Sequence, residues 1–397
     1  MERVVIASAA RTPIGAFGGT LKDTTAVELG GVVIKEVLRR AKIRPDYVDL
    51  VVMGNVLQAG EGQNPSRQAA LLADISQYTP AITINTVCGS GMEAVITATQ
   101  KIQVGAAEIV VAGGMESMSA APLILPKARW GTRMGHVQVL DTVIHDGLWC
   151  SFGDTHMGIT AENIAERFKL SREEQDAFAA LSQQKAEAAI KSGRFKDEIV
   201  PVEIPQRKGD PIIFDTDEFP RFGTTVEKLS KLKPAFAKNG TITAGNSSGI
   251  NDGAAALLLM TAEKALKMGI RPLAKIDAYS CEGCEPELMG TGPIYAVRRA
   301  IERVSEELGK KIDLVELNEA FAAQALACLK ELHLPPDIVN VNGGAIALGH
   351  PIGCSGARIL VTLVYEMQKR NAEVGLASLC VGGGMGYAMI VERGWYF

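Results

Sequence analysis

The stretch AITINTVCGSGMEAVITATQKIQVGAAEIVVAGG, residues 81–114, contains the unit from which the fold is built. In order, it holds an apolar run with β-branched residues, a glycine turn around Cys88, a helical period of about 14 residues and a second apolar run. Short apolar runs bounded by glycines predict buried strands. Buried strands that alternate with helices predict a sheet covered by helices on both faces. The stretch therefore predicts an α/β fold.

The same unit recurs in the C-terminal part of the chain. Three pairs of segments match in order: VDLVVMGN (48–55) with IDLVELNE (312–319), GSGMEAVITATQKI (89–102) with CSGARILVTLVYEM (354–367), and VVAGGM (110–115) with CVGGGM (380–385). The offsets are 264, 265 and 270 residues. Nearly constant offsets indicate duplication of one α/β unit. By this match Cys380 corresponds to Val110, so that thiol is specific to the second half.

A region of different character separates the halves and has no counterpart in the second one. Ser171 followed by Glu174 is a capping-box signal, and Gly193 marks the end of the helical pattern that follows. Long insertions in compact domains are commonly functional. We therefore predict an N-terminal half over 1–118, an inserted loop domain over 119–243, and a third region, 244–397, that completes the first half and becomes the second half from about residue 272.

Composition and charge exclude several classes of function. A chain of 397 residues with 47% hydrophobic and 22% charged residues predicts a globular protein of two fused halves. A net charge of −4 with dispersed Lys and Arg predicts neither a nucleic-acid nor a membrane partner. The start, MERVVIASAARTP, lacks the pattern of a signal peptide. Seven cysteines without a dense framework predict reduced thiols in the cytoplasm.

Cys88 lies where a strand is predicted to end and a helix to begin. Free backbone N–H groups and the helix dipole favour a thiolate at such a junction, and the neighbouring glycines let a carbonyl oxygen approach the backbone. A small buried residue is the alternative interpretation. His350, in NGGAIALGHPIGCSGAR (342–358), precedes the repeat-related turn, so a pseudo-twofold axis would bring it towards Cys88 as a base. Cys380, in LCVGGGMG, is a second thiol at a strand end and is able to move a proton.

Five motifs together resemble those of the thiolase family. They are VCGSG (87–91), AGGMESMS (112–119), NEAFAAQ (318–324), NGGAIALGHPIGCSGAR (342–358) and CVGGGMG (380–386). The resemblance extends over essentially the whole chain and is strongest to the short-chain, biosynthetic branch. It implies two α/β halves in an αβαβα arrangement with an inserted loop domain. It also implies reversible Claisen condensation of two acetyl-CoA molecules to acetoacetyl-CoA and CoA.

The resemblance implies a role for each catalytic residue. Cys88 takes the acyl group, and His350 activates that thiol and helps to hold the thioester oxygen of the second substrate. Cys380 removes or returns the α-proton. Asn318 positions a water beside His350, and the backbone N–H groups of Cys88 and Gly382 form a second oxyanion hole. Two half-reactions through an acyl-enzyme predict ping-pong kinetics.

The resemblance also implies a site for coenzyme A, which acts as a substrate. We expect no permanently bound cofactor and no metal. The insert and its flanks are expected to bind coenzyme A through Leu148, His156, Met157, Arg221, Ala235, Phe236, Ala244, Ser248 and Ile250. Met157, Met289 and Phe321 are expected to close the acyl pocket in favour of short chains.

Three other functions compete with this assignment. The nearest is a degradative 3-ketoacyl-CoA thiolase, which uses the same residues with longer chains. A non-catalytic acyl-CoA carrier would be expected to lack a catalytic residue, and a ketoacyl synthase would carry Cys, His, His instead of Cys, His, Cys. The family also assembles as dimers or tetramers, and ARWGTRMGH (128–136) lies where it carries a tetramerisation loop, so we expect a homotetramer.

The remaining cysteines raise separate hypotheses. Cys281 and Cys284 form a lone C-x-x-C, which is weak evidence for a metal or redox site. Cys354 follows GHPIG where alanine is common in the family, and a small buried residue is the favoured interpretation. Cys88 and Cys380 are expected to form a reversible disulfide under oxidant if their Cα atoms lie within about 7 Å.

Overall fold

The main sheet contains the same strand pattern twice. The computed structural model describes residues 2–131, 133–309 and 311–394. In the first half the strand order is β4-β3-β5-β12-β1, and in the second it is β14-β15-β16-β13. Their bounds are Val4–Arg11 (β1), Leu50–Gly54 (β3), Ala81–Ile84 (β4), Ile109–Ser117 (β5), Asn251–Thr261 (β12), Ala274–Gly283 (β13), Ile312–Leu317 (β14), Val374–Val381 (β15) and Met385–Glu392 (β16). Val339 forms a parallel bridge with Val315 at the place that β4 takes in the first half.

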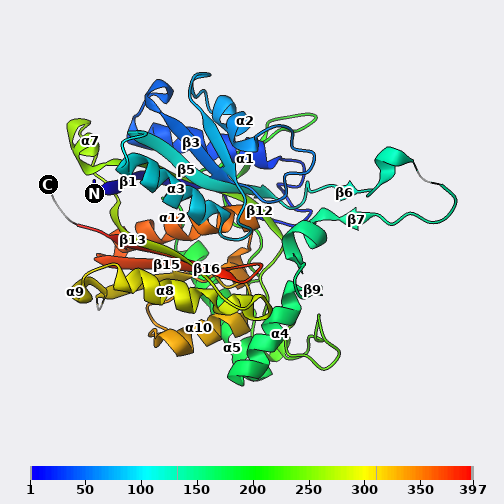
Figure 1. Cartoon of the computed structure of the whole chain (residues 1–397). Helices are drawn as coiled ribbons and strands as arrows, with labels where there is room; N and C mark the ends of the chain where they lie inside the picture. The colour runs from blue at the N-terminus through cyan, green and yellow to red at the C-terminus, as the bar shows by residue number, and fades with distance from the viewer. Residues whose placement is uncertain (1, 132, 310, 395–397) are drawn as a thin grey trace.

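The two halves join edge to edge through β1 and β13. These strands pair antiparallel with Val5 opposite Lys275 and Ile6 opposite Ala274. The helices form three layers, and the strands of each half lie between two of these layers (Figure 1). Helices α1 (Ala26–Ala41) and α2 (Pro65–Leu72) lie outside the first half, α3 (Ser90–Gln103) and α12 (Ile352–Arg370) lie between the halves, and α8 (Gly292–Glu302) and α10 (Ala322–Leu332) lie outside the second half. The expected αβαβα arrangement is confirmed.

The central helices α3 and α12 pack at a glycine from each half. A Cβ on Gly91 would lie 2.7 Å from the backbone nitrogen of Ala357, and one on Gly356 would lie 2.5 Å from that of Met92. Only glycine permits so close an approach of two helix backbones. Because Gly91 and Gly356 are equivalent in the repeat, they mark the pseudo-twofold axis. The turns that precede the two helices therefore lie near each other.

Strand pairing corrects one detail of the repeat. Val52 pairs with Ala112 in the first half, and Glu316 pairs with Ala377 in the second. Val52 and Glu316 match in the repeat and are 264 residues apart. Their partners Ala112 and Ala377 must then match as well, so residues of β15 correspond to residues of β5 at an offset of 265 and not 270. The predicted equivalence of Cys380 with Val110 is therefore wrong, and Cys380 corresponds to Met115. Both strand ends are rich in glycine, so the sequence match paired two similar segments that are out of register.

The insertion lies between β5, which ends at Ser117, and β12, which begins at Asn251. In the second half only residues 382–384 join the equivalent strands. The insertion contains α4 (Met157–Phe168) and α5 (Arg172–Lys191), and α5 begins with the predicted capping box between Ser171 and Glu174. An arm that includes β6 (Leu123–Ile124) and β7 (Leu140–Asp141) extends away from the body (Figure 1). Thr132, in this arm, lies outside the described residues.

The other elements are short. They are β2 (Gly15–Ala16), η1 (Pro45–Tyr47), η2 (Ala128–Trp130), η3 (Val143–Leu148), β8 (Trp149–Cys150), β9 (Thr155–His156), β10 (Val202–Ile204), β11 (Ile212–Phe214), α6 (Val226–Leu229), α7 (Ala262–Lys267), η4 (Pro286–Thr291), α9 (Glu306–Gly309) and α11 (Ala345–Leu348). Among the helices in the described ranges, none has the length and hydropathy required to cross a bilayer.

Candidate active site

A cavity of about 690 Å³ opens where the two halves and the insertion meet. Cys88, His350, Cys380 and Gly382 all line it. Cys88 comes from the turn before α3, and His350 from the equivalent region before α12. Cys380 and Gly382 come from the end of β15 and the turn that follows it. The duplication therefore places residues from both halves around one space.

The turn that carries Cys88 has a constrained backbone. The predicted strand ends earlier than expected, at Ile84, and Val87 adopts a φ of +49°, which is unusual for a β-branched residue. The Ser90 hydroxyl holds this conformation, because it accepts from the Thr86 N–H at 2.9 Å and donates to the Val87 carbonyl at 2.6 Å. The backbone N–H groups of Gly382 and of Cys88 itself lie near the Cys88 sulfur and favour its thiolate.

Burial controls the protonation of the Cys88 thiol. It raises the pKa of Cys88 to about 11, against the two backbone N–H groups that favour the thiolate. The backbone N–H groups at this junction thus favour the thiolate, as expected from the sequence, but burial has the larger effect on the pKa. Burial also lowers the pKa of His350 to about 3, with a smaller contribution from the Arg358 charge. A neutral thiol and a neutral imidazole therefore coexist at pH 7.

Hydrogen bonds orient the His350 ring and select its tautomer. The His350 backbone N–H donates to Oδ1 of Asn251 at 2.9 Å. The Ser355 hydroxyl lies 2.5 Å from Nδ1 of His350 and also donates to the Pro351 carbonyl at 2.9 Å. A hydroxyl has one proton, so Ser355 must accept from Nδ1–H. Nε2 then carries the lone pair and is available as a base.

Asn318 lies behind the histidine and does not line the cavity. It is fully buried just after β14, and its amide nitrogen lies 3.4 Å from Nε2 and 3.5 Å from Nδ1 of His350. Its Oδ1 is buried and has no hydrogen-bond partner among the described residues. Of the sixteen predicted site residues, Asn318 alone lies outside the cavity lining.

Cys380 is a fully buried second thiol. Burial, together with the neighbouring Cys88, raises the pKa of Cys380 well above its ordinary value. A thiol with a raised pKa holds its proton in the resting site and becomes a strong base once it has lost it. Two thiols thus line one cavity, and Cys380 is buried whereas Cys88 is partly exposed.

The cavity continues away from the thiols along residues of the insertion. All eleven predicted coenzyme A and acyl-pocket residues line it: Leu148, His156, Met157, Arg221, Ala235, Phe236, Ala244, Ser248, Ile250, Met289 and Phe321. The rings of His156 and Phe236 stack with centroids 4.8 Å apart, and Phe321 meets Phe236 edge-on at 6.2 Å. Glycine at 158 is required there, because a Cβ would lie 2.2 Å from the Phe236 ring.

Several lining residues were not predicted from the sequence: Ala16, Phe17, Met118, Ile144, Gly147, Glu218, Phe219, Pro220, Ser247, Gly249, Ala320 and Ile352. Five of them, Gly147, Pro220, Ser247, Gly249 and Ala320, directly adjoin a predicted residue, which was a usable signal. Ala16 and Phe17 had none, because they belong to the N-terminal segment. Ser355 and Asn251, which hydrogen-bond to His350, were not predicted either, although Ser355 lies within the motif at 342–358.

The other cysteines contribute nothing visible to the cavity lining. Cys354 is buried in α12, whereas Cys281 is exposed. The Cys284 sulfur lies 3.9 and 3.7 Å from the carbonyl oxygens of Leu288 and Met289. Within the described ranges, no group of three or more His, Cys, Asp or Glu side chains is arranged to hold a metal ion.

Comparison with known proteins identifies the family. The thiolase N-terminal domain matches residues 4–263, and the thiolase C-terminal domain matches residues 270–393. The acetyl-CoA acetyltransferases of Cupriavidus necator and Pseudomonas aeruginosa are 58% and 56% identical to the chain, over 99% of it and 100% of theirs. A crystal structure of the Bacillus anthracis acetyl-CoA acetyltransferase superposes with a TM-score of 0.96 at 48% identity, covering 99% of both chains. The chain belongs to the thiolase family.

Proposed function

We propose that this thiolase is an acetyl-CoA C-acetyltransferase, which converts two acetyl-CoA molecules reversibly to acetoacetyl-CoA and CoA. The observation that carries the proposal is that two thiols and a neutral imidazole line one cavity. The names of the relatives support the same activity. Acyl transfer and carbon–carbon bond formation need a nucleophile, a base for its proton and a second acid or base.

In the first half-reaction the Cys88 sulfur attacks the thioester carbonyl, and His350 Nε2 takes the thiol proton. The carbonyl oxygen becomes an oxyanion that the N–H groups of Cys88 and Gly382 stabilise. The bond between the carbonyl carbon and the coenzyme A sulfur breaks, and Cys380 gives its proton to that sulfur. The site then holds acetyl-Cys88, a His350 imidazolium and a Cys380 thiolate.

In the second half-reaction the Cys380 thiolate removes the α-proton of a second acetyl-CoA. The His350 Nε2–H, together with a water that Asn318 positions, stabilises the enolate oxygen. The enolate carbon attacks the acetyl carbonyl, and Cys88 leaves as a thiolate that recovers its proton from His350. Each thiol and the imidazole end in the state in which they began.

The rest of the cavity provides for binding and chain-length selection. Arg221 suits the anionic nucleotide end of coenzyme A, and apolar residues such as Phe236 and Leu148 suit the pantetheine arm. Met157, Met289 and Phe321 are buried beside Cys380 and limit the room for the acyl chain. Coenzyme A compounds enter as substrates, and we assign no permanently bound cofactor.

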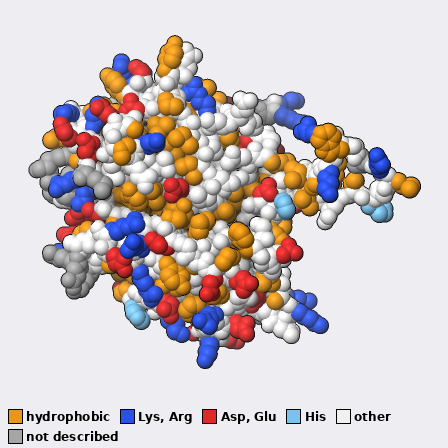
Figure 2. Space-filling model, viewed as in Figure 1, with side chains coloured by type: hydrophobic (Ala, Val, Ile, Leu, Met, Phe, Trp, Pro, Cys, Tyr) orange, Lys and Arg blue, Asp and Glu red, His pale blue; other side chains and the backbone are white. Residues whose placement is uncertain are grey.

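We assign a homotetramer, built through the arm, as the assembled state. Figure 2 shows hydrophobic side chains on this arm among Lys, Arg and His side chains, and Leu123, Trp130 and Met134 are 68%, 86% and 103% exposed. Apolar side chains exposed on a thin projection need a partner surface. A cytoplasmic location suits seven free cysteines, two of which carry the chemistry.

A degradative 3-ketoacyl-CoA thiolase is the alternative function. A chain-length series in both directions separates the two: acetoacetyl-CoA should be cleaved at least about tenfold more efficiently than 3-ketohexadecanoyl-CoA. Equal or faster cleavage of the long substrate would replace the proposed function with the alternative.

The Trp130→Ser/Met134→Ser variant, examined by light scattering, should yield dimers in place of tetramers.

A further inference from the structure

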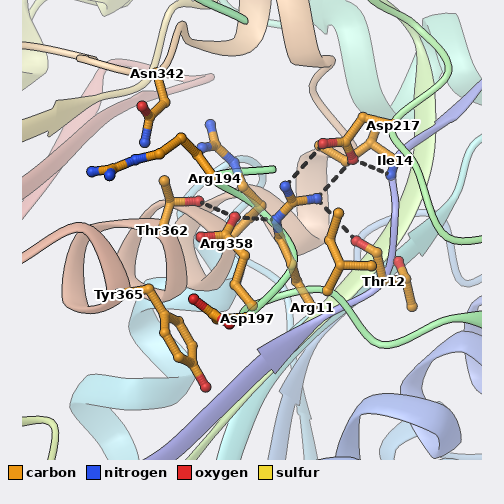
Figure 3. Close-up of polar contacts among 12 residues, drawn as sticks. Arg11, Thr12, Ile14, Arg194, Asp197, Asp217, Asn342, Arg358, Thr362 and Tyr365 are labelled. Atoms are coloured by element: carbon orange, nitrogen blue, oxygen red, sulfur yellow. Dashed lines mark hydrogen bonds and ion pairs between the residues drawn. The ribbon is translucent and has the colours of Figure 1, made fainter. Parts of the chain in front are cut away.

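A fully buried arginine at the end of β1 binds two carboxylates of the insertion (Figure 3). The Arg11 Nε donates to Glu198 at 2.6 Å, and its two terminal nitrogens donate to the two oxygens of Asp217 at 2.7 and 2.9 Å. A fourth bond, at 3.1 Å, reaches the Thr12 carbonyl. The bidentate contact with Asp217 fixes the carboxylate in both distance and angle.

Residues 11–20 of the first half bind the side chains of two consecutive acidic residues of the insertion, Asp217 and Glu218. Asp217 also accepts from the Ile14 N–H at 2.8 Å. Glu218 accepts from the N–H groups of Ala16 and Thr20 at 2.8 and 2.9 Å, and from the Thr20 hydroxyl at 2.6 Å. We call this set of contacts between residues 11–20 and residues 217–218 the clasp.

The clasp forms part of the cavity wall. Ala16 and Phe17 line the cavity from one side of it, and residues 218–221 line it from the other. The next residue after the clasp, Phe219, packs its ring on the backbone of Gly249, where a Cβ would lie 2.3 Å away. A shift of the clasp would therefore move the wall against the neighbouring lining residues Ser248 and Ile250.

We propose that Arg11 is a positioning residue for coenzyme A, which sets the wall formed by residues 218–221 through its bidentate bond to Asp217. This inference rests on the proposed function, because it names coenzyme A as the ligand of that wall. Arg11 itself does not line the cavity. It lies apart from the reacting thiols, so its loss should weaken substrate binding and leave the chemical steps nearly unchanged.

The charges explain why Arg11 is needed. The side chains of Glu198 and Asp217 are 2% and 0% exposed, and Arg11 is their shared counter-charge. Without it two buried carboxylates would face each other unpaired, which strongly disfavours the present geometry. Asp217 directly precedes residues 218–221, which form the wall, and its side chain is short. Any movement of Asp217 that relieves the repulsion would therefore move the cavity wall.

The test compares Arg11→Met with Arg40→Met in the full-length enzyme. Arg40 also bonds the insertion, through the carbonyls of Asp197 and Ile199, but it does not contact Asp217. Arg11→Met should raise the KM for acetoacetyl-CoA and the calorimetric Kd for coenzyme A about tenfold, with kcat changed less than about threefold. Arg11→Lys should recover the KM only in part, since an ammonium cannot form the bidentate bond. Arg40→Met should leave both constants at their wild-type values.

A milder pair of variants keeps the test decisive if Arg11→Met does not fold. Thr20→Val removes the hydroxyl that donates to Glu218, whereas Thr216→Val removes one that donates only to Asp215 in the same loop. The KM should rise about threefold in Thr20→Val and stay unchanged in Thr216→Val. A folded Arg11→Met with an unchanged KM, or equal effects within either pair, would overturn the inference. Absence of turnover in the wild type overturns the proposed function instead, and the Kd for coenzyme A still decides the role of the clasp.

Discussion

The Ser355 hydroxyl lies 2.5 Å from Nδ1 of His350 and decides which nitrogen of the imidazole acts as a base. The two residues belong to one structural unit, since His350 precedes α12 and Ser355 lies in its first turn. The Ser355 hydroxyl donates to the Pro351 carbonyl, so its oxygen accepts from Nδ1–H and leaves the Nε2 lone pair free. Ser355, five residues from His350 in the chain, thus fixes the tautomer in which Nε2 acts as the base.

Ser355→Ala should lower kcat by about tenfold to a hundredfold, because the ring loses the contact that selects its tautomer. Rapid quench of acetyl-enzyme formation measures the effect on the step in which His350 acts. Ser280→Ala is the matched control, since that buried hydroxyl donates to the Ala296 carbonyl, away from the cavity lining. Equal rates for the two variants would show that Ser355 has only a structural role.

Alkylation of Cys88 by iodoacetamide should be nearly independent of pH between about pH 5 and 9. The reacting species is the neutral thiol paired with neutral His350. As pH falls the imidazole is protonated only near its lowered pKa of about 3, and as pH rises the thiol ionises only near its raised pKa of about 11. Peptide mass spectrometry of timed samples gives the rate. A tenfold rise per pH unit up to about pH 11 would instead indicate that the Cys88 thiolate reacts without help from His350.

The free energy of unfolding should fall as pH rises from about 6.5 to 8. Burial raises the pKa of Glu316 to about 8 and that of Glu116 to about 8, so the folded state keeps protons that the unfolded state releases. Each group contributes a slope of about −1.3 kcal/mol per pH unit near pH 6.5, which falls to about −0.7 near pH 8, where the folded state is half deprotonated. Urea unfolding at several pH values should show a shallower slope in Glu316→Gln. An identical slope in that variant would refute the assignment.

Met289→Ala should widen the range of acyl chains. Met289 is buried beside Cys380 and lines the cavity, so its truncation makes room for a few methylenes. The ratio of kcat/KM for 3-ketohexanoyl-CoA to that for acetoacetyl-CoA should rise about tenfold. Leu288→Ala is the control, because Leu288 lies on the same turn but lines a different cavity. An unchanged ratio in Met289→Ala would mean that other residues set the chain length.

Much of the fold was predictable because each signal was local. The glycine turn, the helix after it and the repeat at residues 354–367 were sufficient to predict two α/β halves, and the layered fold is confirmed. Register was harder: the glycine-rich ends of β5 and β15 matched out of step, and only the pairing of Val52 and Glu316 with their neighbours placed Cys380 correctly. The expected domain limits at 118 and 243 remain predictions.

The site depended more on tertiary structure. The motif context of Cys88 and His350 was enough to expect them near one another, and both line the cavity. The pKa of Cys88 was not predictable, because burial outweighs the local helix terminus. Nor was Arg11, whose carboxylate partners are 187 and 206 residues away in the chain. The catalytic roles and the Cys88 to Cys380 disulfide also remain predictions.

The central claim is that the two thiols have separate tasks, and intact-mass spectrometry after incubation with acetyl-CoA tests it most directly. The wild type and Cys380→Ala should each gain the mass of one acetyl group on Cys88, although only the wild type should go on to release acetoacetyl-CoA. Cys88→Ala should gain none. An acetyl group found on Cys380 in Cys88→Ala, or acetoacetyl-CoA formed by Cys380→Ala at the wild-type rate, would contradict the account.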